Sequence, residues 1–220
     1  MKNLRSLTEE NYLKAIYRLK QDHVTKISPT AIAEELSVSA ASVIDMIKKL
    51  SQKKLISYDK SKGVRFLEKG NKEALAIIRN HRLWEVFLLE KLGYSWDIVH
   101  DIAEQLEHVK HPELADRLDS FLGNPEYDPH GDPIPRSNGE IPGIAKTLLL
   151  EIEAGKSCRV VAVKDSSSVF LQYLLQLKVN IGTKIKVLDK IPFDNSLAIQ
   201  IGKEERTTVS KKFAESLLVD

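Results

Sequence analysis

Apolar side chains recur at three- and four-residue spacing through the first 50 residues, which is the period of amphipathic helices. Residues 8–20 follow this pattern, and Thr8 is placed to cap the start of that helix. Ser28 and Pro29 open a second helix, since serine caps helices and proline suits the first helical position. Ser39 opens a third. The pattern predicts a compact helical domain at the start of the chain.

The second and third helices are separated only by a short turn at Ser37 and Val38, which is typical of a helix-turn-helix. The small side chain of Ala33 lets the two helices cross closely, and Val38 and Val43 are expected to fill their shared core. Residues 55–70 then alternate apolar and polar side chains around a Lys-Ser-Lys-Gly turn, which predicts a β-hairpin. The sequence therefore predicts a winged helix-turn-helix.

Helical periodicity continues through the middle of the chain. A long helix is predicted over residues 71–92, and Ser95 is expected to cap the next one, which carries residues 100–108. An amphipathic helix over residues 113–122 follows. These segments predict a central domain built only of helices.

The last hundred residues change character. Residues 123–143 are rich in Pro, Gly and Asp, as linkers are. Short strand patterns follow at residues 159–165, 183–191 and 197–202, with one apolar helical run at 169–177. This predicts a small β-barrel-like domain. The fold class is therefore α+β multidomain: a winged helix-turn-helix, an all-α centre and a small C-terminal barrel.

Charge is unevenly distributed along the 220 residues, although the net charge is only +2. Residues 1–70 hold 14 Lys/Arg against 8 Asp/Glu, whereas residues 71–140 hold 7 against 14 and five of the six histidines. A basic first third favours a polyanionic partner, and an acidic, histidine-bearing middle favours cations. Cys158 is the only cysteine, and no signal peptide or membrane-spanning run is evident, so we expect a cytoplasmic protein without a membrane partner.

The start of the third helix offers small side chains suited to the edges of DNA bases. Lysine and arginine on that helix and on the hairpin are suited to phosphates. The same pattern would also arise in a three-helix core with solvated lysines. The candidate DNA-contacting residues are Ser39, Ala41, Ser42 and Asp45 for bases, and Lys48, Lys62 and Arg65 for phosphates.

Imidazoles and carboxylates recur at helical spacing in the acidic middle of the chain. Four of them, His100, Glu104, Glu107 and His108, are placed on or near one helix face, and His81 and Glu85 repeat the four-residue spacing on the preceding helix. A solvated acidic face with surface histidines remains the alternative. Ligands of this kind without thiolate favour Mn²⁺ or Fe²⁺ over a closed structural zinc site.

Enzymatic interpretations are weaker. The zinc-protease spacing His-Glu-x-x-His is absent, and the paired Glu-x-x-His motifs of di-iron bundles are not complete. No Gly-rich phosphate loop or nucleophile–base set is evident, so we expect no enzyme and no small organic substrate. A metal-binding helical enzyme or storage protein, and a DNA-binding regulator of a non-metal signal, remain as alternatives.

Four segments carry a resemblance to a known family: TEENYLKAIY, RNHRLWEVFL, VHDIAEQLEHV and DPHGDPIP. With the predicted domain order, the chain resembles the diphtheria toxin repressor family of iron- and manganese-dependent transcription regulators. The resemblance implies a winged-helix DNA-binding domain (1–70), a helical metal-binding and dimerisation domain (71–122), a linker (123–143) and an SH3-like, FeoA-like domain (144–220).

The resemblance also implies two metal positions. The regulatory one would use Asn11, Glu104, Glu107 and His108, and the second would use His81, Glu85 and His100. Glu104 stands where iron-sensing members often have Cys, which resembles the manganese-sensing branch. Lys14 stands where some manganese sensors have a metal-binding Glu. The C-terminal domain of iron-type members lends ligands to the second site, and the matching region here offers Asp165 and Gln172.

The implied function is repression of metal-homeostasis genes. A homodimer loaded with Mn(II), or alternatively Fe(II), would bind palindromic double-stranded operator DNA, and Co(II), Ni(II) or Zn(II) would substitute in vitro. A metal that bridges the DNA-binding and helical domains would favour one separation of the two recognition helices in the dimer.

Overall fold

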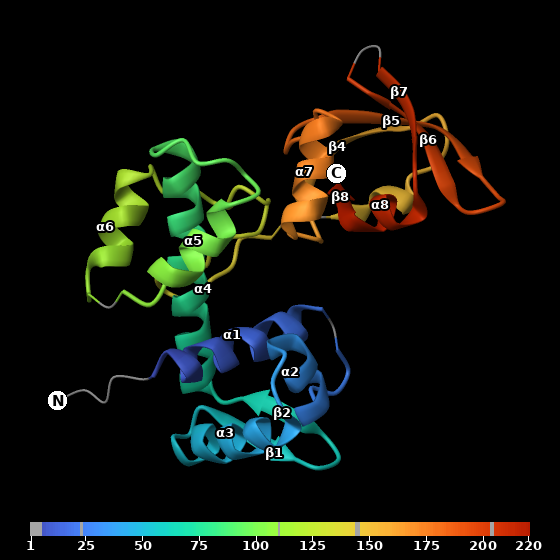
Figure 1. The fold of residues 1–220 in the computed structure, drawn as a ribbon. Coiled ribbons are helices and arrows are strands. Elements are labelled where there is room, and N and C mark those ends of the chain that lie inside the picture. The colour runs from blue at the N-terminus through green and yellow to red at the C-terminus, as the bar shows by residue number, and fades with distance from the viewer. Residues whose placement is uncertain (1–5, 23, 110, 144–145, 203–204) are drawn as a thin grey trace. The chain divides into compact units, whose positions relative to one another are not determined.

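The computed structural model (Figure 1) describes residues 6–22, 24–109, 111–143, 146–202 and 205–220. The chain folds as two compact units, and their boundary falls within helix α4 (Glu68–Glu90). The first unit comprises Met1–His81, Glu107–Lys110 and Pro135–Glu140, and the second comprises Arg82–Leu106, His111–Ile134 and Ile141–Asp220. The predicted domain boundary at residue 144 lies outside the described residues.

The first unit contains the predicted winged helix-turn-helix, which the structure confirms. Its helices and its antiparallel hairpin are α1 (Leu7–Gln21), α2 (Pro29–Leu36), α3 (Ala40–Gln52), β1 (Ile56–Asp59) and β2 (Gly63–Phe66). Figure 1 shows the three helices gathered with the hairpin at the N-terminal end of α4. Leu13, Ile16 and Val43 are fully buried in their common core, so the apolar face of each helix is turned inward as its periodicity predicts.

Two details of this domain differ from expectation. Ser6, not Thr8, caps α1: its hydroxyl accepts a hydrogen bond from the backbone N–H of Glu9. With Ser6 as the cap, Glu9 lies three residues further on, where a glutamate stabilises the start of a helix. Val38 is 40 % exposed and does not fill the core, because it lies in the turn after Ser37, whose left-handed backbone ends α2.

The wing is fixed to the helices through its glycine. Gly63 has φ +76°, and a Cβ added there would lie 2.6 Å from the backbone oxygen of Ile27. The next residue, Val64, donates its backbone N–H to that same oxygen at 2.8 Å. A side chain at position 63 would therefore break the junction between the hairpin and the loop before α2.

The second unit begins with the rest of α4 and continues with α5 (Val99–Leu106) and α6 (Leu114–Phe121). Helix α4 starts three residues earlier than predicted. Ser95 does not cap α5: its hydroxyl donates to Asp97, and its carbonyl accepts from Ile98 in a turn before the helix. Helix α5 also ends at Leu106, so Glu107 and His108 lie in the following turn and belong to the first unit.

The C-terminal domain is a six-stranded antiparallel sheet with strand order β3-β8-β4-β5-β6-β7. Its strands are β3 (Thr147–Leu148), β4 (Ser157–Val163), β5 (Lys184–Ile191), β6 (Ser196–Ile201), β7 (Glu205–Val209) and β8 (Leu217–Val219). Three of them were predicted. Leu171 of α7 (Ser168–Gln176) and Phe213 of α8 (Lys211–Ser216) are buried in the domain's core. The strands β3 and β7 are the edges of this sheet among the described residues, so its hydrogen bonding does not close a barrel. None of the described helices has the length and apolarity needed to span a membrane.

Candidate metal centre

Helix α1 turns two charged side chains into the first unit. Glu10 and Lys14 are four residues apart and therefore share a helix face, and they are only 3 % and 5 % exposed. The neighbouring Asn11, a predicted ligand, is exposed. Charged residues are seldom buried without partners, so the partners of Glu10 and Lys14 identify the polar centre of this unit.

Lys14 meets one carboxylate and one imidazole. Its Nζ lies 2.6 Å from Oε2 of Glu107 and 3.1 Å from Nδ1 of His81. The same Oε2 is 2.6 Å from Nδ1 of His81, so three polar groups converge on one point. The side chains of Glu107 and His81 are almost completely shielded from solvent. A buried carboxylate needs positive charge beside it, and here Lys14 supplies it.

The second oxygen of Glu107 is in a different state. Oε1 is buried and accepts no hydrogen bond among the described residues. Its neighbour is Nε2 of His108 at 3.7 Å, and Nδ1 of His108 lies 2.7 Å from Oε2 of Glu10. A buried carboxylate oxygen with open lone pairs beside an imidazole and a second carboxylate fits a divalent cation, because each of these groups is a hard or borderline ligand.

The second unit holds another set of predicted ligands. His100 Nδ1 lies 3.0 Å from Oε1 of Glu85, and His100 Nε2 lies 3.4 Å from Oε1 of Glu104. Glu85 is buried, whereas His100 and Glu104 are half-buried. Helices α4 and α5 thus bring three of the predicted residues together at hydrogen-bonding distance.

The proline-rich segment, residues 123–143, places two further side chains of metal-binding types beside Glu85. Asp128 and His130 are buried, and each can place a ligand atom within 4.8 Å of the others and of a Glu85 oxygen. Burial disfavours a charged His130, but the hydrogen bond and charge of Glu85 and the charge of Asp128 outweigh it and raise the pKa of His130 to about 9. Burial, with the nearby charges of Glu85 and Asp132, raises the pKa of Asp128 to about 7.

Two cations offset this acidic group. Arg82 Nε lies 3.4 Å from Asp128, and its Nη2 lies 3.4 Å from Asp132. The other terminal nitrogen, Nη1, donates to the backbone oxygen of Pro133 at 2.6 Å. Lys146 donates to the backbone oxygen of Gly131 at 2.8 Å, and burial lowers its pKa despite the nearby carboxylates. The cluster is therefore held by ion pairs as it stands, and a metal there would compete with them.

The same segment is attached to the C-terminal sheet. The backbone oxygen of His130 accepts a hydrogen bond from the N–H of Val163 on β4 at 2.9 Å. The His130 ring stacks on Trp96 with centroids 5.8 Å apart. Gly131 has φ +83°, and a Cβ there would lie 2.0 Å from the backbone oxygen of Val161. Asp128 and His130 are thus positioned by the sheet as well as by α4.

Some of the predicted residues lie together as the resemblance groups them, since Glu107 is beside His108 and His100 is beside Glu85. His81 pairs with Glu107, and His100 pairs with Glu85 and Glu104. Asp165 accepts from the backbone of Ser167, and Gln172 donates to Asp97. Sequence reasoning noted Lys14 only as a departure from the manganese sensors, and it passed over three residues of these clusters: Glu10, Asp128 and His130. The DPHGDP motif was a signal for the last two, because it places an Asp and a His two residues apart beside proline.

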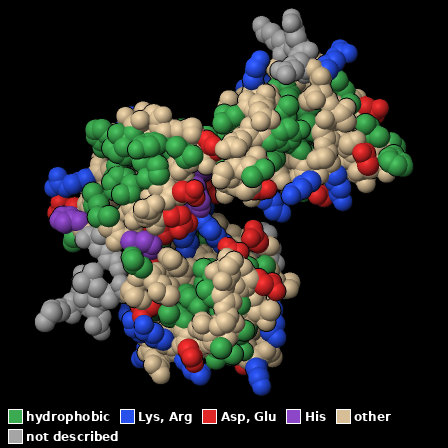
Figure 2. Space-filling view, viewed as in Figure 1, with side chains coloured by type: hydrophobic (Ala, Val, Ile, Leu, Met, Phe, Trp, Pro, Cys, Tyr) green, Lys and Arg blue, Asp and Glu red, His purple; other side chains and the backbone are tan. Residues whose placement is uncertain are grey.

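The candidate DNA-contacting residues lie on one domain, and all seven are exposed. Ser39 caps α3, since its hydroxyl accepts from the backbone N–H of Ser42 at 3.2 Å. Asp45 pairs with Lys48 on the outside of the same helix at 3.2 Å. Figure 2 shows Lys and Arg side chains on the visible surface of this domain. The start of α3 and the wing are therefore accessible to a polyanion.

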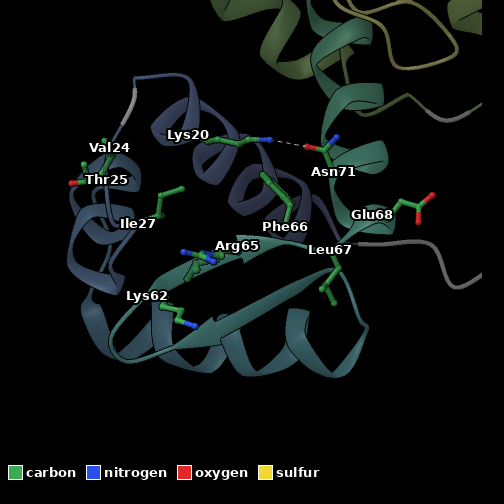
Figure 3. Close-up of a pocket in the computed structure, with 11 residues that line it drawn as sticks. Lys20, Val24, Thr25, Ile27, Lys62, Arg65, Phe66, Leu67, Glu68 and Asn71 are labelled. Atoms are coloured by element: carbon green, nitrogen blue, oxygen red, sulfur yellow. Dashed lines mark hydrogen bonds between the residues drawn. The ribbon is translucent and has the colours of Figure 1, made fainter.

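A groove of about 620 Å³ runs beside the wing (Figure 3). Lys62 and Arg65 come from the hairpin, and Lys20 comes from the end of α1 and donates to the side-chain oxygen of Asn71 at 3.2 Å. The other residues that line the groove are Val24, Thr25, Ile27, Val64, Phe66, Leu67 and Glu68. The lining thus holds three cations and one acid, so the groove adds to the basic character of this face.

Three family models match the chain in succession. Residues 6–64 match the iron dependent repressor N-terminal DNA binding domain, and residues 67–136 match the iron dependent repressor metal binding and dimerisation domain. Residues 147–220 match the FeoA domain. The match to the second model spans α4 to the proline-rich segment, which includes both clusters of candidate ligands except the residues of α1.

Two known repressors are similar to the chain in sequence. The iron-dependent repressor IdeR of Mycobacterium tuberculosis is 35 % identical over 128 residues, which cover 58 % of this chain and 55 % of that protein. The chain thus aligns with about half the length of this relative. The diphtheria toxin repressor of Corynebacterium diphtheriae is 28 % identical over 195 residues, covering 83 % of this chain and 85 % of that protein.

Solved structures match over nearly the whole length. A manganese-dependent transcriptional repressor in complex with manganese is 33 % identical, with a TM-score of 0.86 over 96 % of this chain and 98 % of that one. ScaR with bound Zn²⁺ is 30 % identical, with a TM-score of 0.81 over 96 % and 98 % of the two chains. The chain therefore belongs to the family of iron-dependent repressors.

Proposed function

We propose that this protein is a metal-dependent transcriptional repressor that binds palindromic operator DNA as a homodimer when it is loaded with Mn²⁺, or alternatively Fe²⁺. The observation that carries the proposal is the Glu107 carboxylate. One of its oxygens is buried and accepts no hydrogen bond from the part of the chain that the structure describes, and it lies beside His108 in the same unit as the DNA-binding helices. An unsatisfied buried acceptor is rare and costly, and a bound cation would satisfy it.

Glu107 and His108 would hold the regulatory metal, with Glu104 as a further predicted ligand. Helix α1 would supply either Asn11, as the resemblance implies, or Glu10, which already contacts His108 at 2.7 Å. Carboxylate and imidazole donors without a thiolate favour Mn²⁺ over metals that prefer soft sulfur ligands. Co²⁺, Ni²⁺ and Zn²⁺ would bind the same donors in vitro, since their intrinsic affinities are higher or similar.

Glu85 and His100 would hold a second metal, with His81 as the remaining predicted ligand. Asp128 and His130 add a carboxylate and an imidazole beside Glu85 and make this position richer in donors than the sequence indicated. Because His130 and Gly131 are attached to β4, the C-terminal domain would influence this position through the proline-rich segment.

The regulatory metal would act by tying two parts of the chain together. Glu107 and His108 follow the last turn of α5, and Glu10 and Asn11 lie on the first helix of the DNA-binding domain. A metal that these residues share favours the arrangement in which they are close. In a dimer, that arrangement sets the separation of the two α3 helices, which must match half-sites spaced by whole turns of DNA. A coupling of about 1–3 kcal/mol would change operator affinity about 5- to 150-fold.

The residues that contact DNA would fall into two groups, those that meet base edges and those that meet phosphates. Ser42, Ala41 and Asp45 at the start of α3 would meet base edges, with Ser39 holding that helix end in place through its cap. Lys48, Lys62 and Arg65 would contact phosphates, and the basic groove beside the wing supports this face as the one that meets DNA. The similarity of the chain to IdeR, to the diphtheria toxin repressor and to a manganese-dependent repressor supports the same assignment.

The test is an anaerobic DNA-binding titration. A high-affinity duplex is selected from a random pool with Mn²⁺ present, and its affinity is then measured with Mn²⁺, Fe²⁺, Co²⁺ and Zn²⁺, each against a chelated control. The proposal predicts that metal strengthens binding, and that Glu107→Gln removes the effect while Glu113→Gln, on an exposed pair with Arg117, keeps it. Equal affinity with and without metal would instead indicate a regulator of another signal.

A further inference from the structure

Lys14 is a buried lysine in a basic domain that has many exposed ones. Its side chain is only 6 % exposed, on the face of α1 that also carries Glu10. Lysine is rarely buried, because its ammonium loses hydration there and a charged partner must offset that loss. The position of Lys14 therefore requires an explanation in terms of what surrounds its amine.

Two of the groups beside the amine are of the kinds that bind metal ions. Glu107 Oε2 lies 2.6 Å away, a short charge-assisted hydrogen bond, and His81 Nδ1 lies 3.1 Å away. Both groups belong to the same unit as Lys14. The ammonium thus takes the place beside them that a cation would take, and it supplies one positive charge where a metal ion would supply two.

We propose that Lys14 is the resident cation of this site: it stabilises the Glu107 carboxylate while the protein is metal-free, and metal loading displaces it. The proposal rests on the assignment of Glu107 as a metal ligand. A divalent ion bound to Glu107 and an ammonium 2.6 Å from the same carboxylate repel each other at short range in a buried site. Lys14 therefore weakens metal binding and sets the metal concentration at which the protein loads.

The two oxygens of Glu107 give this exchange a path. Oε2 is held by Lys14, whereas Oε1 accepts no hydrogen bond among the residues that the structure describes and faces His108 at 3.7 Å. An arriving ion has an open oxygen at which to begin before the ammonium leaves. A lysine side chain with four carbons can swing away to solvent, whereas a shorter or rigid cation could not.

The first experiment measures Mn²⁺ affinity by calorimetry on the full chain and on Lys14→Met, which keeps an unbranched side chain one atom shorter and removes the charge. Lys20→Met is the matched control, because Lys20 lies on the same helix, is exposed and bonds to Asn71. We expect Lys14→Met to bind Mn²⁺ at least tenfold more tightly than the wild type, and Lys20→Met to stay within twofold. The metal-free Lys14→Met protein should also melt at a lower temperature, and Mn²⁺ should raise its melting temperature more.

The outcomes separate this proposal from the proposed function. If the wild type binds Mn²⁺ and Lys14→Met binds it with the same affinity, the role of Lys14 is overturned and the proposed function is not. Weaker binding in Lys14→Met would also overturn it, since the amine would then assist the metal. Binding only by Lys14→Met would support the role of Lys14 and contradict the proposed function, and no binding by either protein would overturn both.

A second measurement needs no destabilised variant. The ammonium of a buried, ion-paired lysine exchanges its protons slowly enough to be seen by nitrogen-15 NMR, and Lys14→Arg, which keeps the charge, assigns the signal. Zn²⁺ is diamagnetic and serves as the probe. We expect the Lys14 signal of the wild type to shift or vanish as Zn²⁺ is added to one equivalent. A signal that stays unchanged while Zn²⁺ binds would overturn the proposal.

Discussion

Glu107 is the residue on which both the metal-free fold and the candidate metal centre depend, so its replacement is the most informative perturbation. Glu107→Gln keeps the shape of the side chain and removes its charge. The buried Lys14 ammonium would then lose the carboxylate that lies 2.6 Å from it and would still lie 3.1 Å from His81. The change should destabilise the metal-free protein even though no apolar contact is lost.

The size of the effect follows from the distances. Two unit charges 2.6 Å apart attract by about 6 kcal/mol at an effective dielectric constant of 20, and the cost of burying them cancels part of this. Removing one partner of such a buried pair costs about 3–5 kcal/mol. A typical domain is stable by only about 5–15 kcal/mol, so Glu107→Gln should remove a large share of the stability of its unit.

The matched control is Asp45→Asn in the same unit. Asp45 and Lys48 form an ion pair at 3.2 Å, but their side chains are 79 % and 68 % exposed, and such pairs contribute about 0–1 kcal/mol. Urea unfolding of chelator-treated protein is followed by amide hydrogen exchange in α1, because both tryptophans lie in the other unit. If Glu107→Gln cost no more than Asp45→Asn, the buried ion pair would not stabilise this unit and the reasoning would be wrong.

Three further predictions concern other parts of the chain. Lys53 and Lys49 overcome the effect of burial and hold the pKa of Glu9 below its usual 4.5, so its contribution to stability is present above pH 4.5 and is lost as the pH falls through the lowered pKa. Glu9→Gln should therefore cost about 1.5–3 kcal/mol at pH 7 in urea titrations, and the difference from wild type should shrink in acid. Gly131→Ala should lower the melting temperature more than Gly155→Ala, because both have positive φ but only at Gly131 does a Cβ meet backbone, 2.0 Å away; equal shifts would contradict the close approach. Arg65→Ala should weaken binding to all DNA sequences alike and reduce the salt slope by about 0.9 in anisotropy titrations, whereas an unchanged slope would exclude a phosphate contact.

The periodic parts of the fold were predictable from the sequence. The three N-terminal helices, the wing and the long α4 each have an unbroken apolar pattern, and the structure confirms them within a few residues. The strands β3, β7 and β8 were missed, and β3 and β8 are only two and three residues long. Such short segments acquire strand structure only by pairing with neighbours, which no local pattern reports.

The residue types that gather in the two clusters were predictable, but only part of their grouping was. Positions 10, 11 and 14 of a helix lie within about a turn of one another. Choosing between Glu10 and Asn11 therefore requires knowing where Glu107 and His108 lie, and that depends on α5 ending at Leu106. The approach of Asp128 and His130 to Glu85 depends on how the proline-rich segment is attached to β4. Both facts come from tertiary contacts that spacing along the chain does not contain.

The central claim is that metal and operator DNA favour the same state of the protein. Thermodynamic linkage makes this reciprocal: if metal tightens DNA binding by some factor, DNA must tighten metal binding by the same factor. The direct test is the Mn²⁺ affinity of the wild-type protein measured with and without the selected operator duplex at one salt concentration. We predict that the duplex tightens Mn²⁺ binding about 5- to 150-fold, and an affinity that is the same with and without DNA would contradict the account.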